Sequence, residues 1–149
     1  MTESDTDMRK TIGASACLML AIAATPAAAF TSEELFEQRS PSIYVVHTYD
    51  KAGKKLGTGS AVVIGREQMI TNCHVLAKAS SIAVSRGNIT LGATLEWPDP
   101  ERDLCQLKVK DLPAPAAPLG SAFKVRVGQR VFAIGAPRGL ELTLSDGIV

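Results

Sequence analysis

The sequence has little of several features that would point to a particular class of protein. Of its 149 residues only 5% are aromatic, three are cysteine and two are histidine. Lys plus Arg number 16 against 15 Asp plus Glu, so no basic excess can neutralise a phosphate backbone, and no nucleic acid partner is expected. The one long apolar run, near the start, is too short and too interrupted by Gly, Thr and Pro for a transmembrane helix, so no membrane span is expected.

The composition that is present is that of a globular protein, with 46% hydrophobic and 21% charged residues, 12 Gly and 8 Pro. The N-terminal segment, 1–29, has a separate pattern. Arg9 and Lys10 precede an uncharged stretch, 11–24, and Ala27 to Ala29 supply the small residues that a signal peptidase reads. This pattern predicts a secretory leader cut after Ala29 and an exported protein, periplasmic or secreted; the alternative is a buried N-terminal helix.

Most of the remaining chain is predicted to form short strands separated by turns. One helix is expected over 32–39, because Thr31 and Glu34 fit a capping box and Pro41 prevents continuation. Runs rich in β-forming residues follow at 43–49, 57–64, 68–71, 81–85, 89–97, 104–109, 130–134 and 140–144. Many short strands with almost no amphipathic helix favour an antiparallel barrel or sandwich.

A proline-rich segment divides the strands into two groups. Pro113, Pro115 and Pro118 exclude a central strand here, because proline lacks the ladder donor. The expected organisation is a leader (1–29), a barrel of six strands (30–112), a linker (113–120) and the incomplete start of a second unit (121–149).

Two residues stand where chemistry is expected, although each alone has a structural explanation. His74 follows an apolar strand in Thr-Asn-Cys-His-Val, and Asp103 opens the run Asp-Leu-Cys-Gln-Leu-Lys-Val further along the chain. A lone histidine there is more often structural, and a lone acid is usually a turn residue. Their neighbours add to the signal. The relevant stretches, in order, are 57–64, 71–75, 103–109, 127–140 and 145–149.

This order resembles that of trypsin-like serine peptidases of the bacterial HtrA/Deg type, over residues 40 to 149. The resemblance implies an all-β, trypsin-like double β-barrel, with the first six-stranded barrel complete and the second truncated. It implies that His74 is the general base and Asp103 the acid that orients it, that the substrate is a polypeptide, and that no cofactor or metal is needed.

The family's nucleophile lies in a Gly-x-Ser-Gly-Gly stretch, which this sequence does not contain. Ser60, Ser121 and Ser145 lie near glycines but not at the family's position. The chain is therefore expected to be an inactive fragment of a serine endopeptidase. Two rivals remain open: a non-catalytic barrel that binds a peptide or protein by strand addition, and a cysteine peptidase of the same fold.

Cys73 and Cys105 flank the candidate pair. If His74 touches Asp103, the two cysteines lie on neighbouring segments, and a disulfide becomes an option in an oxidising compartment. The alternatives are two small buried thiols or a zinc site with His74 and His47, which the adjacent Cys73 and His74 disfavour. His47 and Trp97 are assigned no role.

Overall fold

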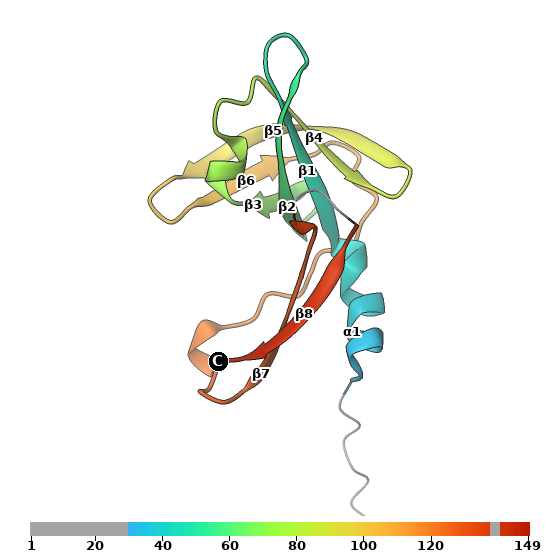
Figure 1. Cartoon of the computed structure of the whole chain (residues 1–149), viewed down its shortest axis with the longest axis vertical. Coiled ribbons are helices and arrows are strands. Elements are labelled where there is room, and N and C mark those ends of the chain that lie inside the picture. Colours follow the sequence, from blue (N-terminus) through green and yellow to red (C-terminus); the bar gives the residue numbers. More distant parts are fainter. Residues whose placement is uncertain (1–29, 138–140) are drawn as a thin grey trace, which may run out of the picture.

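The computed structural model describes residues 30–137 and 141–149. The predicted leader lies outside these residues. The described chain is nearly all β, with a closed six-stranded antiparallel barrel in the order β1-β2-β3-β6-β5-β4 and a separate two-stranded sheet, β7-β8 (Figure 1). Among the described residues no helix is long and apolar enough to cross a membrane.

The chain enters the barrel through the predicted helix, α1 (Ser32–Arg39), and a 3₁₀ turn, η1 (Ser40–Ser42). The capping box is formed as the sequence predicts. The backbone N–H of Glu34 donates to Thr31 Oγ1 at 3.1 Å, and the N–H of Thr31 donates to the Glu34 carboxylate at 2.8 Å. Two of the free donors at the start of the helix are thereby satisfied.

A hairpin of β1 (Ile43–Tyr49) and β2 (Lys55–Gly65) starts the barrel. Its turn is closed by Asp50 Oδ1, which accepts from the N–H groups of Ala52 and Lys54, and Gly53 supplies the positive φ of 79° that the turn requires. Side chains along β1 alternate in burial, as expected of a strand with one face toward a core.

The remaining barrel strands are β3 (Gln68–Thr71), β4 (Ser81–Arg86), β5 (Ile89–Asp99) and β6 (Leu104–Lys108). Each of the barrel strands begins and ends close to its predicted range. β3 pairs with β6 rather than with β4, and the register places Thr71 opposite Cys105. The end of β3 and the start of β6, which are far apart in the sequence, therefore meet at one rim of the barrel.

The barrel interior is the core of the structure. Seven of its apolar side chains are at most 1% exposed: Tyr44, Val46, Val63, Met69, Val84, Leu107 and Val109. They come from β1, β2, β3, β4 and β6 and from the residue after β6. This continuous apolar core makes the rim a rigid support for polar residues.

The proline-rich segment contains no strand, as predicted, but it is attached to the barrel. The N–H of Ala117 donates to the carbonyl of Val63 at 2.8 Å, and Leu112 and Ala114 pack against the core. A 3₁₀ turn that the sequence did not predict, η3 (Ala122–Lys124), follows.

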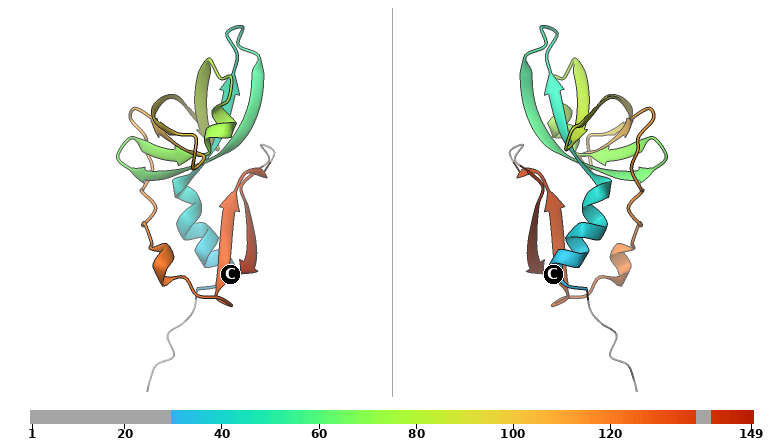
Figure 2. Two further views of the ribbon diagram at one scale, coloured as in Figure 1. Left: turned by 90° about the vertical axis from the view of Figure 1, so that its left-hand side faces the viewer. Right: turned by 90° about the vertical axis from the view of Figure 1, so that its right-hand side faces the viewer.

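The second sheet consists of β7 (Arg130–Gly135) and β8 (Thr143–Ile148), beside α1 and below the barrel in both side views (Figure 2). The predicted strand over 140–144 is displaced toward the C-terminus. Leu140 lies outside the described residues, and β8 starts at Thr143, because the register pairs Thr143 with Gly135. Glu141 and Leu142 belong to the connection.

Candidate active site

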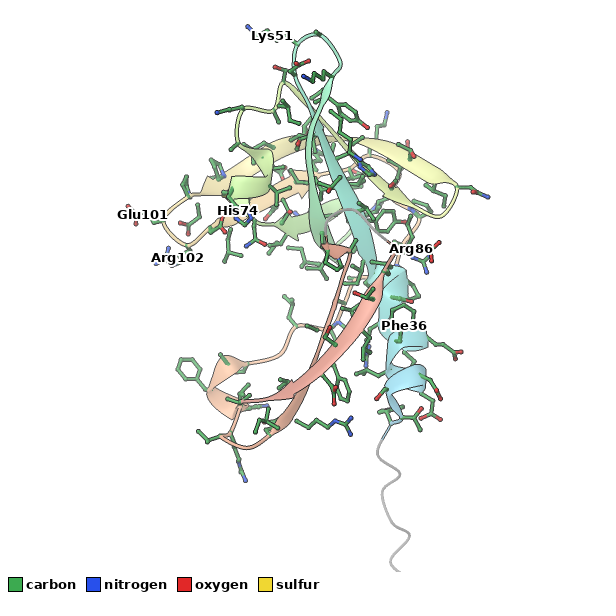
Figure 3. All side chains as sticks on the ribbon, viewed as in Figure 1. Phe36, Lys51, His74, Arg86, Glu101 and Arg102 are labelled. Carbon is green, nitrogen blue, oxygen red and sulfur yellow. A yellow bond between two sulfur atoms is a disulfide. The ribbon has the colours of Figure 1, made fainter. Side chains whose placement is uncertain are left out.

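His74 lies on a short 3₁₀ turn, η2 (Cys73–Leu76), directly after β3. The strand end is fixed by Thr71, a buried residue whose Oγ1 donates to the carbonyl of Ser60 at 2.8 Å. Within the turn the N–H of Val75 donates to the carbonyl of Asn72 at 3.2 Å. The histidine is thus held by a compact turn on the barrel rim, on the same side as the loop that carries Glu101 and Arg102 (Figure 3).

Asp103 ends the loop between β5 and β6 in a left-handed conformation, with a φ of 54°. Aspartate and asparagine tolerate this region better than most residues. The loop is stabilised by Asp99, whose carboxylate accepts from the backbone N–H of Arg102 at 3.2 Å and from its guanidinium at 2.8 Å. In this backbone conformation the Asp103 side chain points toward η2, where it contacts His74.

The two candidate residues are in direct contact. His74 Nδ1 lies 2.6 Å from Asp103 Oδ2, and the backbone N–H of His74 donates to Asp103 Oδ1 at 2.9 Å. Asn72 Nδ2 donates to the Asp103 carboxylate at 3.2 Å and to its carbonyl at 3.1 Å. Because an ionised carboxylate can only accept, Nδ1 carries the proton, and the lone pair of the imidazole is on Nε2.

The same contacts lower the pKa of Asp103. The backbone N–H of His74 is the largest cause, followed by the side chain of His74. Since the pKa is lower in the folded than in the unfolded chain, these contacts contribute stability at pH values above the unfolded pKa. That contribution is lost as the pH falls through the folded pKa. At neutral pH Asp103 is therefore a carboxylate.

The site is open to solvent on the side of the histidine. The His74 side chain is 73% exposed and that of Asp103 41%. An open cavity of about 560 Å³ adjoins them, lined by Cys73, His74, Leu76, Ala77, Leu95, Pro98, Pro100, Asp103 and Cys105. A reacting group can approach Nε2 from outside the barrel.

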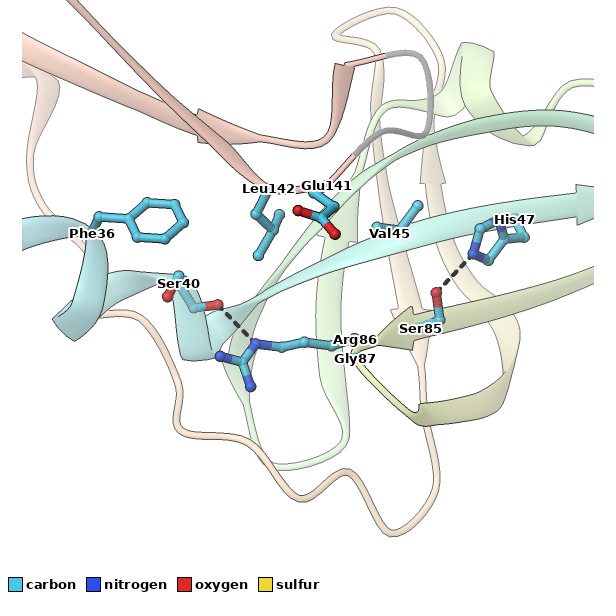
Figure 4. Close-up of a pocket in the computed structure, with 9 residues that line it drawn as sticks. All are labelled: Phe36, Ser40, Val45, His47, Ser85, Arg86, Gly87, Glu141 and Leu142. Atoms are coloured by element: carbon cyan, nitrogen blue, oxygen red, sulfur yellow. Dashed lines mark hydrogen bonds between the residues drawn. The ribbon is translucent and has the colours of Figure 1, made fainter. Parts of the chain in front are cut away.

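A larger cavity, of about 640 Å³, lies away from this pair and contains the second histidine (Figure 4). His47 Nε2 lies 2.7 Å from Ser85 Oγ, while its buried Nδ1 has no hydrogen-bond partner among the described residues. Burial, with a smaller contribution from Lys55, lowers the pKa of His47. Without an acid on Nδ1, His47 lacks the group that orients a catalytic base.

Gly59 gives the turn room to approach the barrel. A Cβ at this position would lie 2.6 Å from Val75 Cγ2 and 2.8 Å from Val75 Cγ1. The valine is β-branched and stiff, so it cannot move aside without moving its backbone. The absence of a side chain at Gly59 therefore lets η2 lie against β2.

We expect Gly59→Ala to destabilise the fold by about 1–3 kcal/mol through overpacking. Adding Val75→Ala should recover part of that loss, which urea unfolding of both variants will measure. Gly92→Ala is the matched control, because a Cβ in that strand meets nothing within 4 Å. Equal stabilities of the Gly59→Ala and Gly92→Ala variants would contradict the packing described above.

Comparison with known proteins shows to which family the chain belongs. The sequence model of the "Trypsin-like peptidase domain" family matches residues 59–149. The chain belongs to the trypsin-like peptidase family. Its similarity to the HtrA type is seen in a "Probable periplasmic serine endoprotease DegP-like" of Pseudomonas putida (strain GB-1), which is 34% identical over 118 residues. That alignment covers 78% of this chain and 25% of the relative.

Two further proteins match the chain with similar identity and coverage. "Protease Do-like 1, chloroplastic" of Arabidopsis thaliana is 32% identical over 129 residues, covering 77% of this chain and 29% of the relative. The solved "HtrA-type protease AlgW with tripeptide" is 34% identical with a TM-score of 0.70, covering 76% of this chain and 38% of that one. The chain thus spans about a quarter of the length of the first curated relative.

The structure also shows where the other residues singled out in the sequence of this member of the trypsin-like peptidase family lie. Cys73 and Cys105 are joined by a disulfide with a Cα–Cα distance of 5.0 Å. Their sulfurs are therefore not free for the thiol pair or the zinc site considered above. Ser60 Oγ accepts from the N–H of Ala136 at 2.8 Å, which ties the residue after β7 to the barrel.

Sequence reasoning missed two contributors to the site. Asn72 and Gly59 lie in two of the motif stretches, 71–75 and 57–64, but the sequence assigns neither of them a role in the site. Asn72 had a signal, since an amide two residues before a candidate base is a potential donor to its acid. The Gly59 contact had none, because it depends on the path of a turn in another part of the chain.

Proposed function

We propose that this chain supplies the general base and its orienting acid to an exported serine endopeptidase, which cleaves polypeptides by acyl transfer. The carrying observation is the 2.6 Å contact between His74 Nδ1 and Asp103 Oδ2, with the exposed His74 side chain lining an open cavity. The arrangement fixes one tautomer and leaves the accepting nitrogen accessible, which is what a catalytic base requires.

In this mechanism Nε2 of His74 accepts the proton of a serine hydroxyl as the oxygen attacks the scissile carbonyl. The imidazolium then gives that proton to the leaving amine, and a water molecule repeats the cycle to release the acyl group. Asp103, already ionised, stabilises the imidazolium without taking the proton. No metal or cofactor takes part in these steps.

The serine and the oxyanion donors are proposed to lie outside this chain, because the sequence has no Gly-x-Ser-Gly-Gly stretch. The chain is then inactive by itself. Activity is tested in a longer form that contains such a stretch. That form should cleave a denatured polypeptide and its His74→Ala variant should not; equal cleavage by both would overturn the proposal.

The proposal of an exported protein, periplasmic or secreted, rests on the basic and apolar pattern of residues 1–29, and a curated relative is named periplasmic. The proposal also keeps the division into a barrel unit (30–112), a connector (113–120) and the start of a second unit (121–149).

This division predicts where a protease cuts first. The exposed residues 118–121 lie beyond the Ala117 to Val63 hydrogen bond and before η3. We expect the first elastase cut of the folded chain between 115 and 121, identified by mass spectrometry. A first cut inside the barrel would contradict the division.

The alternative function, peptide or protein binding by strand addition, draws on one observation. β7 and β8 pair only with each other within the described residues, so each has an edge whose N–H and C=O groups face outward. The two functions differ in one measurement. A longer form that binds peptide but shows no turnover with its Gly-x-Ser-Gly-Gly serine in place would favour binding.

A further inference from the structure

The disulfide joins the two segments that carry the candidate pair. Cys73 is the first residue of η2 and immediately precedes His74, and Cys105 lies two residues after Asp103. The two ends differ in their surroundings. Cys105 is 3% exposed and is paired on both sides within the barrel wall, with Thr71 of β3 and Pro98 of β5. The disulfide therefore ties a surface turn to a fixed point in the sheet.

The turn also packs on the barrel through Val75, which lies against Gly59 of β2, and through the buried Leu76. Within the part of the chain that the structure describes, its other links to the loop before β6 are hydrogen bonds exposed to water. They end on one residue, Asp103, which accepts from Asn72, from the backbone of Cys73 at 3.4 Å and from His74. Exposed hydrogen bonds compete with water and contribute little individually to holding two segments together. The covalent bond, unlike these links, does not open when water replaces a protein partner.

We propose that the Cys73–Cys105 disulfide is a positioning element, which holds the start of η2 against β6 and so keeps His74 Nδ1 within hydrogen-bond reach of the Asp103 carboxylate. This inference rests on the proposed function for its catalytic meaning, but the contact itself can be measured without turnover. Cys73 and Cys105 touch no reacting atom; they act through the base and its acid.

The bond is accessible to a small reductant. Both cysteines line the open cavity of about 560 Å³ beside His74, and Cys73 is only partly buried. A dithiol attacks the Cys73 sulfur, the S–S bond breaks, and a second attack closes the reagent into a cyclic disulfide. Two electrons and two protons pass from the dithiol to the two cysteine sulfurs. Oxidised and reduced forms of the same chain can thus be compared.

The test compares the titration of two aspartates in one loop, followed by NMR of their carboxyl carbons. The pKa of Asp103 is lowered chiefly by the backbone N–H and the side chain of His74, so it reports the contact. The pKa of Asp99 is lowered by its hydrogen bonds to Arg102, which do not involve η2, so Asp99 is the internal control. The samples are the oxidised chain, the dithiol-reduced chain and a Cys73→Ser/Cys105→Ala variant.

We expect the pKa of Asp103 to rise toward its ordinary value in the reduced chain and in the double variant, while that of Asp99 stays low. Methyl signals of the buried Val46 and Val84 check that the barrel remains folded. An unchanged Asp103 titration would overturn the proposal. A rise at both aspartates would also overturn it, because the disulfide would then stabilise the whole loop or fold rather than the pair.

Turnover of a longer form that contains the serine gives the second readout. Reduction should lower kcat by about 10²-fold with little change in KM, the size of effect expected when a catalytic group is misplaced by about 1 Å. An Asp103→Asn form, which lacks the orienting carboxylate, should respond much less to reduction; an equal response would count against the proposal. If Asp103 titrates as expected but His74→Ala leaves turnover intact, the proposed function fails while the positioning contact stands.

Discussion

Replacing His74 by alanine should reduce turnover by several powers of ten in a longer form of the protein that contains the expected serine. A serine hydroxyl is a weak nucleophile until a base removes its proton. In this structure the His74 side chain is exposed beside an open cavity, and the Asp103 carboxylate on Nδ1 leaves Nε2 as the proton acceptor. Losses of this size are typical when one member of a triad is removed, because its members act as a unit.

Asp103→Asn tests the orienting acid more finely than removal does. Asparagine tolerates the left-handed backbone at this position, so the loop is kept. Its amide NH₂, however, favours the opposite tautomer of His74, with the proton on Nε2. Chymotrypsin-type enzymes lose roughly 10⁴-fold in turnover from the corresponding change, and we expect a loss of that order here. Peptide hydrolysis at saturating substrate is the measurement.

The matched control is Asp99→Asn, at the start of the same loop. Asp99 bonds Arg102 and makes no hydrogen bond to His74, so its replacement should leave turnover within a few-fold. Greater damage at Asp99 than at Asp103 would show that the acid has been misassigned.

The pH dependence of turnover gives an independent check of the same pair. Only a neutral imidazole accepts a proton, so turnover should fall as the solution is acidified. The lowered pKa of Asp103 keeps that carboxylate ionised at pH values above its folded pKa. Turnover that falls only where Asp103 itself becomes protonated would contradict His74 as the base; the pH profile of kcat/KM is the measurement.

The barrel strands were predictable from the sequence because each combines a local signal with a clear boundary. β3, for example, carries Met69, Ile70 and Thr71 between the turn after Gly65 and Asn72, and its ends match the prediction. β8 was displaced because its start depends on pairing with β7, which no local pattern records. Strand ends set by register are decided by the partner strand.

From the sequence, only the identity of the two candidate residues could be predicted, through the order of the motifs that contain them. That order places His74 and Asp103 together by resemblance, and the structure shows how the contact is made. The left-handed φ at Asp103 and the close packing of Gly59 on Val75 come from tertiary contacts. A single sequence records neither, since aspartate is common in turns and glycine in strands has several explanations.

The chain by itself should not be labelled by a serine-directed fluorophosphonate, whereas the longer form should be labelled stoichiometrically. Such a reagent needs a hydroxyl activated by a base and an oxyanion site beside it. Within the described residues, no serine hydroxyl hydrogen-bonds His74. Ser60 Oγ instead accepts a hydrogen bond from the N–H of Ala136. The measurement is intact mass after incubation, with heat-denatured chain as the control for unspecific reaction.

Ser85 is the serine that could react despite the expected absence of labelling, because its hydroxyl lies 2.7 Å from an imidazole nitrogen of His47. That contact alone does not make a nucleophile. Among the described residues His47 has no acid on its buried Nδ1 to stabilise an imidazolium, and burial lowers its pKa, so it is a weaker base. A label on Ser85 that disappears in the Ser85→Ala variant would show a second reactive serine. A label on any other serine between 30 and 149 would show that the nucleophile lies in this chain and that its position has been misjudged.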